Sequence, residues 1–136
     1  MGSDHTRPDH AATELLITFL YYADLPRAMA FYEDVLGLPL AIDQGWSKIY
    51  RVTAGGLIGL VDETRGSHRA HPVKPVQVCL RVADIEAWHR WLVGQGVAIL
   101  KGPRDVPALG IRVLVIRDRE GYEVEIQSVL PPAAST

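Results

Sequence analysis

The sequence predicts an α+β domain in which two tandem βαβββ modules form a curved mixed sheet around a cup. Each half contains apolar stretches of strand length and one stretch with helical spacing. The order of these elements occurs twice, since Asp24 and Leu25 are matched sixty residues later by Asp84 and Ile85. A chain of 136 residues with 48% hydrophobic residues is also suited to one domain with a single core.

The first half begins with residues 15–22, an aromatic-rich apolar run that predicts a strand. Asp24 is a good N-cap, and Pro26 is tolerated in the first turn of the helix that follows. Gly37 is suited to ending this helix. Three shorter strands, separated by glycine-containing turns, are then predicted at residues 39–43, 46–53 and 57–61.

The second half predicts a strand over residues 76–82 and a helix that Asp84 caps. Gly94 and Gly96 are placed to end that helix. The remaining strands are predicted at residues 97–100, 111–116 and 122–127, with a turn over 118–121.

These elements predict a single domain over residues 14–130. Module one spans 14–62, a polar linker 63–75, and module two 76–130. Residues 1–13 and 131–136 are polar or small and are expected to be flexible tails. A module of this size struggles to bury its sheet alone, so we do not expect the modules to be independent domains.

Composition argues against several classes of partner. The net charge is −2 with no basic block, which disfavours a nucleic-acid partner. No apolar run approaches the ~20 residues that span a membrane, and the polar N-terminus lacks the apolar core of a signal peptide. The single cysteine, Cys79, cannot form an internal disulfide. We therefore expect a cytoplasmic protein.

Two segments carry a resemblance to a known family. FYEDVLGLPL at residues 31–40 and DREGYEVEI at residues 118–126 resemble signatures of the glyoxalase / bleomycin-resistance / extradiol-dioxygenase superfamily, also called the vicinal oxygen chelate superfamily. The resemblance covers residues 14–128. It implies the two-module fold, but the superfamily includes isomerases, dioxygenases, epimerases, thiol transferases and binding proteins.

The resemblance also implies a divalent metal with two ligands from each module, one on the first strand and one on the last. Gln77 and Glu125 match these positions in module two. Ile17 and Gly59 occupy them in module one, and neither has a side chain that binds a metal. We therefore expect an incomplete site in which a divalent ion is held weakly at most, and favour no tightly bound metal.

Each candidate ligand has a simpler interpretation. Glu125 can be a partly solvated strand carboxylate and Gln77 a polar residue at the rim of the cup. Without a metal, Glu125 is a candidate general base. His68 and His71 could supply ligands if the linker folded over the cup, but a solvated loop is the favoured interpretation.

Strand alternation predicts the lining of the cup. Phe19 and Tyr21 share a face with Ile17 and form an aromatic wall, for which core packing is an equally good interpretation. Residues that share a face with Gln77, together with carboxylates of the last strand, form a polar wall. Such a mixture suits a small, partly apolar molecule. The predicted ligand-binding residues are Phe19, Tyr21, Trp46, Tyr50, Cys79 and Arg81.

Two function classes follow. We favour a protein that binds a small, partly apolar organic molecule in a cup with an incomplete metal site. The alternative is a metal-dependent lyase, isomerase or dioxygenase of the same superfamily, so enzymatic activity stays open. By analogy with the family, and because sheet edges need covering, we expect a homodimer.

Overall fold

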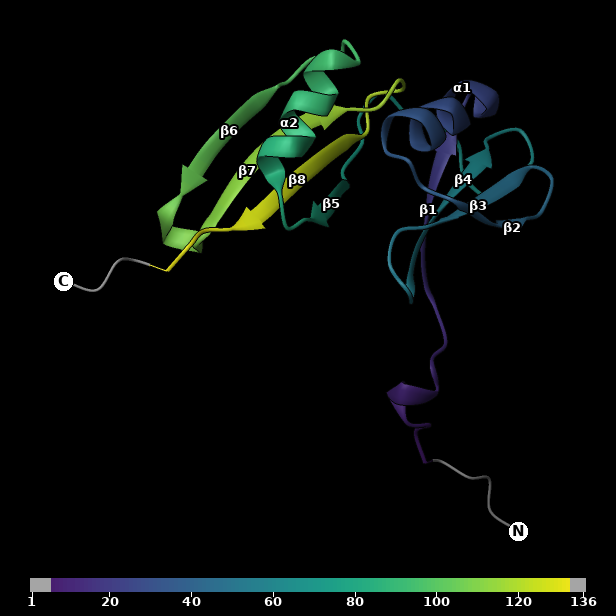
Figure 1. The fold of residues 1–136 in the computed structure, drawn as a ribbon. Coiled ribbons are helices and arrows are strands. Elements are labelled where there is room, and N and C mark those ends of the chain that lie inside the picture. Colours follow the sequence, from purple (N-terminus) through teal and green to yellow (C-terminus); the bar gives the residue numbers. More distant parts are fainter. Residues whose placement is uncertain (1–5, 133–136) are drawn as a thin grey trace.

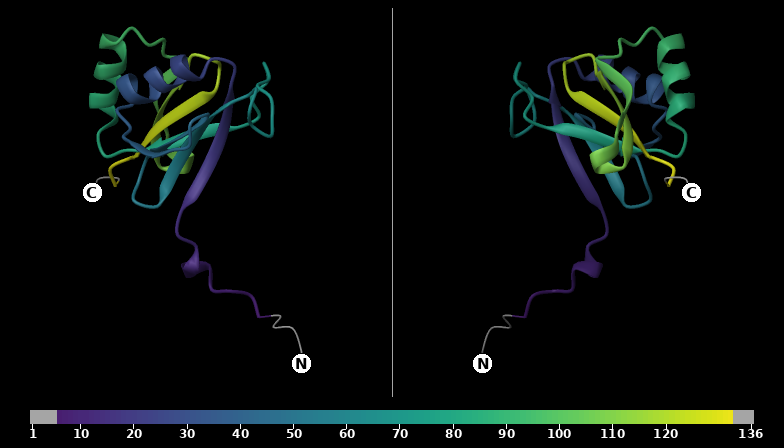
Figure 2. Two further views of the ribbon diagram at one scale, coloured as in Figure 1. Left: turned by 90° about the vertical axis from the view of Figure 1, so that its right-hand side faces the viewer. Right: turned by 90° about the vertical axis from the view of Figure 1, so that its left-hand side faces the viewer.

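The computed structural model describes residues 6–132 and has the predicted α+β architecture, with two βαβββ modules in tandem (Figure 1). Residues 1–5 and 133–136, where parts of both predicted tails fall, lie outside the described residues. Ahead of the first strand is a short 3₁₀ turn, η1 (His10–Ala12), which lies away from the two sheets (Figure 2). No helix within residues 6–132 is long and apolar enough to cross a membrane.

Module one pairs four strands in the order β1-β4-β3-β2, with β1 parallel to β4 and the other pairs antiparallel. The predicted cap is present, since the Asp24 side chain accepts a hydrogen bond from the backbone N–H of Arg27. A π-helical turn continues the first helix. The elements are β1 (Leu16–Tyr22), α1 (Leu25–Ala30), η2 (Phe31–Val35), β2 (Leu40–Asp43), β3 (Ser47–Arg51) and β4 (Gly56–Asp62).

Module two repeats this topology in the order β5-β8-β7-β6, again with one parallel pair, β5 and β8. Asp84 caps its helix through the N–H of Ala87. The elements are β5 (Gln77–Arg81), α2 (Ile85–Gly94), β6 (Lys101–Val106), the 3₁₀ turn η3 (Pro107–Leu109), β7 (Ile111–Arg117) and β8 (Glu123–Val129).

One predicted strand was misplaced. The apolar run at residues 97–100 is not a strand, and β6 instead begins at Lys101. Val97 and Ile99 are partly buried against the core, which accounts for the apolar pattern. β6 lies at the edge of its sheet and pairs with β7 alone, through a register irregularity between Lys101 and Arg104. An edge strand of this kind tolerates proline and charged residues, so its sequence carries no clear alternation.

Hydrogen bonding divides the eight strands into two sheets of four, and both helices lie on the same side of these sheets (Figure 1). Buried residues on this side form one core that includes Leu20 and Leu60 of module one and Leu114 and Ile126 of module two. We call the opposite side, which the helices leave uncovered, the open face of each module.

A buried polar cluster joins the modules. The Tyr22 and Tyr32 hydroxyls of module one both donate to Oδ2 of Asp118 in module two, at 2.5 and 2.9 Å. The other carboxylate oxygen, Oδ1, accepts from the backbone N–H groups of Glu120 and Tyr122. Burial and these neighbours raise the pKa of both tyrosines, which keeps the hydroxyls protonated as donors.

The same turn of module two also caps the helix of module one. The Glu120 carboxylate accepts hydrogen bonds of 2.8 Å from the backbone N–H groups of Ala23 and Asp24. The Tyr122 hydroxyl bonds both the N–H and the carbonyl of Tyr21. The turn therefore supplies partners that module one lacks by itself.

Candidate functional site

The open face of module one is apolar at the position where the family resemblance implies a metal ligand. Phe19 and Gly59 are paired residues of the parallel strands β1 and β4. A Cβ placed at Gly59 would overlap the ring of Phe19, so this ring occupies the space that a longer side chain at 59 would need. Phe19 is nevertheless 42% exposed, so much of its ring is free to contact a ligand.

A cavity of about 260 Å³ lies over this face. Three aromatic side chains line it: Phe19 and Tyr21 from β1, and Trp46 from the turn before β3. The polar residues Gln44, Ser47 and Ser67 also line it. An aromatic wall with a few polar groups is typical of a small-molecule site.

The linker folds against Tyr21. The Tyr21 hydroxyl lies 3.2 Å from Oγ of Ser67, and the His68 ring meets the Tyr21 ring edge-on at 5.1 Å between centroids. Gly66 permits this approach, because a Cβ there would lie 2.9 Å from Cε1 of Tyr21. Ser67 and His68 stay exposed, as expected for a solvated linker, but they also lie against Tyr21 at the edge of this cavity.

A second cavity of about 380 Å³ opens between Phe19, Tyr21 and this linker. Its other lining residues are mainly apolar or basic: Leu20, His68, Arg69, His71, Val73, Lys74, Pro75, Val76 and Tyr122. The two cavities share Phe19 and Tyr21, so the aromatic wall serves both.

The open face of module two is polar. Glu125 Oε2 accepts hydrogen bonds from Cys79 Sγ at 3.4 Å and from Gln127 Nε2 at 2.8 Å. Arg81 Nε in turn donates to Gln127 Oε1 at 2.8 Å. One chain of hydrogen bonds therefore crosses β5 and β8 and joins Cys79, Glu125, Gln127 and Arg81.

Cys79 is not an activated nucleophile in this arrangement. Partial burial of the thiol, its hydrogen bond to Glu125 and the negative charge of Glu125 raise the pKa of Cys79 to about 11, although Arg81 opposes the shift. A thiol with this pKa is protonated at neutral pH and reacts slowly.

Tyr50 lies on the other side of its sheet from the predicted position. It is fully buried under the helical segment, and its hydroxyl donates to Oε1 of Glu33 at 2.8 Å. Trp46 and Tyr50 were both predicted to bind the ligand from the strand expected at residues 46–53, but Trp46 lies in the turn before β3 and Tyr50 lies within β3. Of the two, Trp46 is the one that lines a cavity with Phe19 and Tyr21.

The residues present do not fit a tightly bound metal. Gln77 Nε2 lies 3.5 Å from Glu123, two pairs along the strands from Cys79 and Glu125. Within residues 6–132 no three His, Cys, Asp or Glu side chains are grouped so that they could hold a metal ion. His71 is also engaged elsewhere, since its Nδ1 accepts from the N–H of Val73. We derive no chemistry through a metal at these positions.

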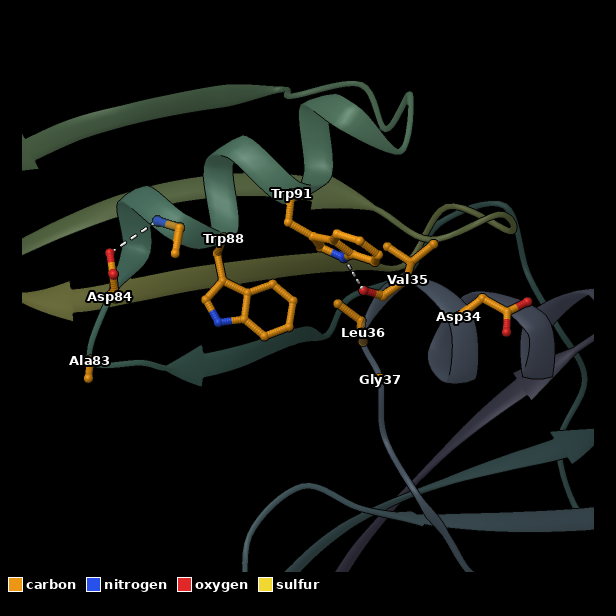
Figure 3. A pocket seen from close by; sticks show the side chains of 9 residues that line it. Asp34, Val35, Leu36, Gly37, Ala83, Asp84, Trp88 and Trp91 are labelled. Carbon is orange, nitrogen blue, oxygen red and sulfur yellow. Dashed lines mark hydrogen bonds between the residues drawn. The ribbon is translucent and has the colours of Figure 1, made fainter.

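A separate groove of about 510 Å³ lies between the helical segments of the two modules (Figure 3). Trp88 and Trp91 of α2 project toward Val35 and Leu36, and Trp91 Nε1 donates to the Val35 carbonyl at 2.8 Å. The groove is lined mainly by apolar groups. The hydrogen bond between Trp91 and Val35 joins the helical segments of the two modules beside this groove.

The linker residues are the part of the site that the sequence did not reveal. His68 was considered because imidazole binds metals, yet it contacts Tyr21, and Lys74 Nζ lies 4.7 Å from the centroid of the Tyr122 ring. The sequence feature that could have indicated this contact is the small pair Gly66 and Ser67, which is flanked by Arg65, His68 and Arg69. Spacing alone does not show where a linker folds.

The sequence model of the Glyoxalase/Bleomycin resistance protein/Dioxygenase superfamily matches residues 7–126. No curated protein matches the chain. Similar solved structures include lactoylglutathione lyase from Agrobacterium tumefaciens, with 22% identity, a TM-score of 0.68, and coverage of 84% of this chain and 92% of that one. TioX from Micromonospora sp. ML1 has 23% identity, a TM-score of 0.71 and coverage of 85% and 98%. A glyoxalase/bleomycin resistance protein/dioxygenase from Nocardioides has 19% identity, a TM-score of 0.71 and coverage of 98% and 91%.

Proposed function

Because the chain belongs to the Glyoxalase/Bleomycin resistance protein/Dioxygenase superfamily, we propose that it binds a small, partly apolar organic molecule against the aromatic open face of module one. Binding would take place without a tightly held metal ion. This function agrees with the apolar residues Ile17 and Gly59 at the positions where the family resemblance implies metal ligands.

The observation that carries this proposal is the partly exposed aromatic wall. Phe19 and Trp46 are 42% and 41% exposed, although large apolar side chains gain free energy when they are covered. They line a cavity together with Tyr21, whose ring is fixed by the linker. A rigid aromatic surface beside polar groups favours a planar or amphipathic ligand.

The polar open face of module two lines neither of the two cavities beside Phe19 and Tyr21, and we propose it as a second, polar binding surface. Its network from Cys79 through Glu125 and Gln127 to Arg81 orders groups that can meet polar atoms of a ligand. Glu125 Oε2 accepts two hydrogen bonds from its neighbours, which holds the carboxylate in place. We assign this network to binding and not to catalysis.

A homodimer is part of the proposal. β2 and β6 are sheet edges, and Leu16 of the edge strand β1 is an exposed apolar residue. A twofold dimer covers such edges with the same surface of a second copy. Light scattering at micromolar concentration should give twice the mass of the chain, and a monomeric mass would contradict this part.

The test is to screen small aromatic and amphipathic compounds by thermal shift and to measure the affinity of hits by calorimetry. We expect chelators to leave the affinities unchanged. In Phe19→Ala the affinities should fall about tenfold or more, because the ring supplies contact area. Leu109→Ala, at an exposed apolar residue of η3, is the matched control and should leave affinity unchanged.

Metal content measured by mass spectrometry separates this proposal from a metal-dependent enzyme. We expect no stoichiometric divalent ion in the wild type or in Glu125→Gln. About one tightly held ion per chain, lost in Glu125→Gln, would overturn the metal-free part of the proposal.

A further inference from the structure

The cavity between module one and the linker has an uneven charge. Its lining includes the cationic side chains Arg69 and Lys74 and the imidazoles of His68 and His71, while its lining residues include no Asp or Glu. The chain as a whole has a net charge of −2, so a cavity lined by cations without a carboxylate departs from the average surface. Such a lining favours an anionic group.

The positive charges of Arg69 and Lys74 are not neutralised by a carboxylate in the described part of the chain. Within residues 6–132, neither Arg69 nor Lys74 has a carboxylate within ion-pair distance. Arg69 uses Nη1 for the backbone carbonyls of Glu63 and Gly66, which fixes the guanidinium and leaves its other nitrogens without a recorded partner in the described part of the chain. Lys74 Nζ is placed 4.7 Å from the centroid of the Tyr122 ring.

The histidines add hydrogen-bond donors to the same rim. His71 Nδ1 accepts from the N–H of Val73 at 3.1 Å, so in the neutral ring the proton lies on Nε2. His68 is held edge-on against Tyr21. The aromatic wall and the basic rim are therefore joined through the Tyr21 contacts, within the reach of one small molecule.

Resting on the proposed function, we infer that the ligand is a small aromatic anion, such as an aryl carboxylate, whose ring lies against Phe19 and Tyr21 and whose anionic group is held by Arg69 and Lys74. The guanidinium matches a carboxylate in a bidentate geometry, and the ammonium adds a point charge. The linker thereby selects the charge of the ligand, while module one selects its aromatic ring.

The experiment uses three probes of one shape: 1-naphthoate, the neutral 1-naphthamide and the cationic 1-naphthylmethylammonium ion. Calorimetry with the full chain should show naphthoate binding about tenfold more tightly than the amide, since charge-assisted hydrogen bonds are stronger than neutral ones. The cation should bind most weakly. The preference for naphthoate should shrink as ionic strength rises.

Two variants test whether Lys74 and Arg69 cause the preference for naphthoate over naphthamide. Lys74→Gln and Arg69→Gln should each reduce the affinity for naphthoate and leave that for naphthamide nearly unchanged. Arg65→Gln removes an exposed linker cation that does not line the cavity, and it should change neither affinity. Arg69 also holds the linker backbone, so Arg69→Gln could lose binding of all three probes by disturbing the linker. In that case the inference is judged on Lys74→Gln alone.

The outcomes separate the two proposals. Equal affinity for naphthoate and naphthamide, or tighter binding of the cation, would overturn the inference about charge and leave the aromatic site in place. An unchanged preference in Lys74→Gln and Arg69→Gln would also overturn it. Binding of none of the three probes would count against the proposed function itself, and the inference would fall with it.

Discussion

Module one and module two have the same topology, but their open faces differ at equivalent positions. Phe19 lies over Gly59 in module one, and the corresponding pair in module two is Cys79 and Glu125, which are hydrogen-bonded. One pair presents an aromatic surface and the other a polar network. The repeat therefore sets the backbone, while the side chains on the uncovered face divide apolar and polar contacts between the halves.

The modules also differ in how they use the turn before the last strand. In module one, Thr53 Oγ1 accepts from the N–H of Gly56, a contact within the turn. In module two, Asp118 and Glu120 accept hydrogen bonds from module one. The turn of module two thus supplies acceptors to module one, whereas the turn of module one makes this contact within its own module.

The largest expected effect comes from breaking that dependence. Asp118→Ala leaves the buried hydroxyls of Tyr22 and Tyr32 and two backbone N–H groups without their acceptor. We expect a loss of about 3 kcal/mol in the free energy of unfolding, measured by urea denaturation. Asp34→Ala, at an exposed carboxylate of η2, should cost less than about 0.5 kcal/mol. Equal stability of the two variants would contradict the role of the cluster.

The polar face of module two can be tested through Cys79. Glu125 raises the pKa of the thiol by its hydrogen bond and charge, so Glu125→Gln should lower that pKa and increase the thiolate fraction. We expect alkylation by iodoacetamide near pH 8 to accelerate about threefold for each unit by which the pKa falls, since the thiolate fraction rises about tenfold while thiolate nucleophilicity drops. Glu123→Gln, whose partner is Gln77, is the control and should leave the rate unchanged. A similar acceleration in both would show that the effect is not local.

The apolar face of module one can be tested at Gly59. Gly59→Ala forces the Phe19 ring to move and should cost about 1 kcal/mol, at the low end for overpacking because the ring can turn toward solvent. The same substitution in a Phe19→Ala background should cost less, which a double-mutant cycle measures. Gly94→Ala, where a Cβ meets no neighbour within 4 Å, is the control. Additive effects would show that Phe19 does not fill this space.

The smallest expected effect concerns the helices. Trp91→Phe removes the hydrogen bond to the Val35 carbonyl but keeps an aromatic ring, and should cost about 0.5–1 kcal/mol in chemical denaturation. Trp88→Phe changes the same residue type in the same groove, but within residues 6–132 the Trp88 indole N–H has no recorded partner. A larger loss in Trp88→Phe would show that ring size outweighs the hydrogen bond.

Local patterns predicted most of the fold because they depend on short stretches of chain. The caps at Asp24 and Asp84 and the repeat of strand and helix could be read from residue type and spacing. The pattern failed at β6, an edge strand that needs no apolar alternation, and at Tyr50. Tyr50 was misassigned because residue type and strand position do not show which face of β3 is covered, and the structure buries this side chain.

The amino-acid sequence by itself determined the two-module architecture and placed the apolar residues Ile17 and Gly59 where the family resemblance implies metal ligands, because periodicity and residue identity are local properties. Tertiary structure alone decided that Phe19 fills the space beside Gly59 and that the linker, with Arg69 and Lys74, lies against the aromatic wall. These contacts join segments far apart in the chain. Their formation depends on packing between sheets and linker, which no local spacing specifies.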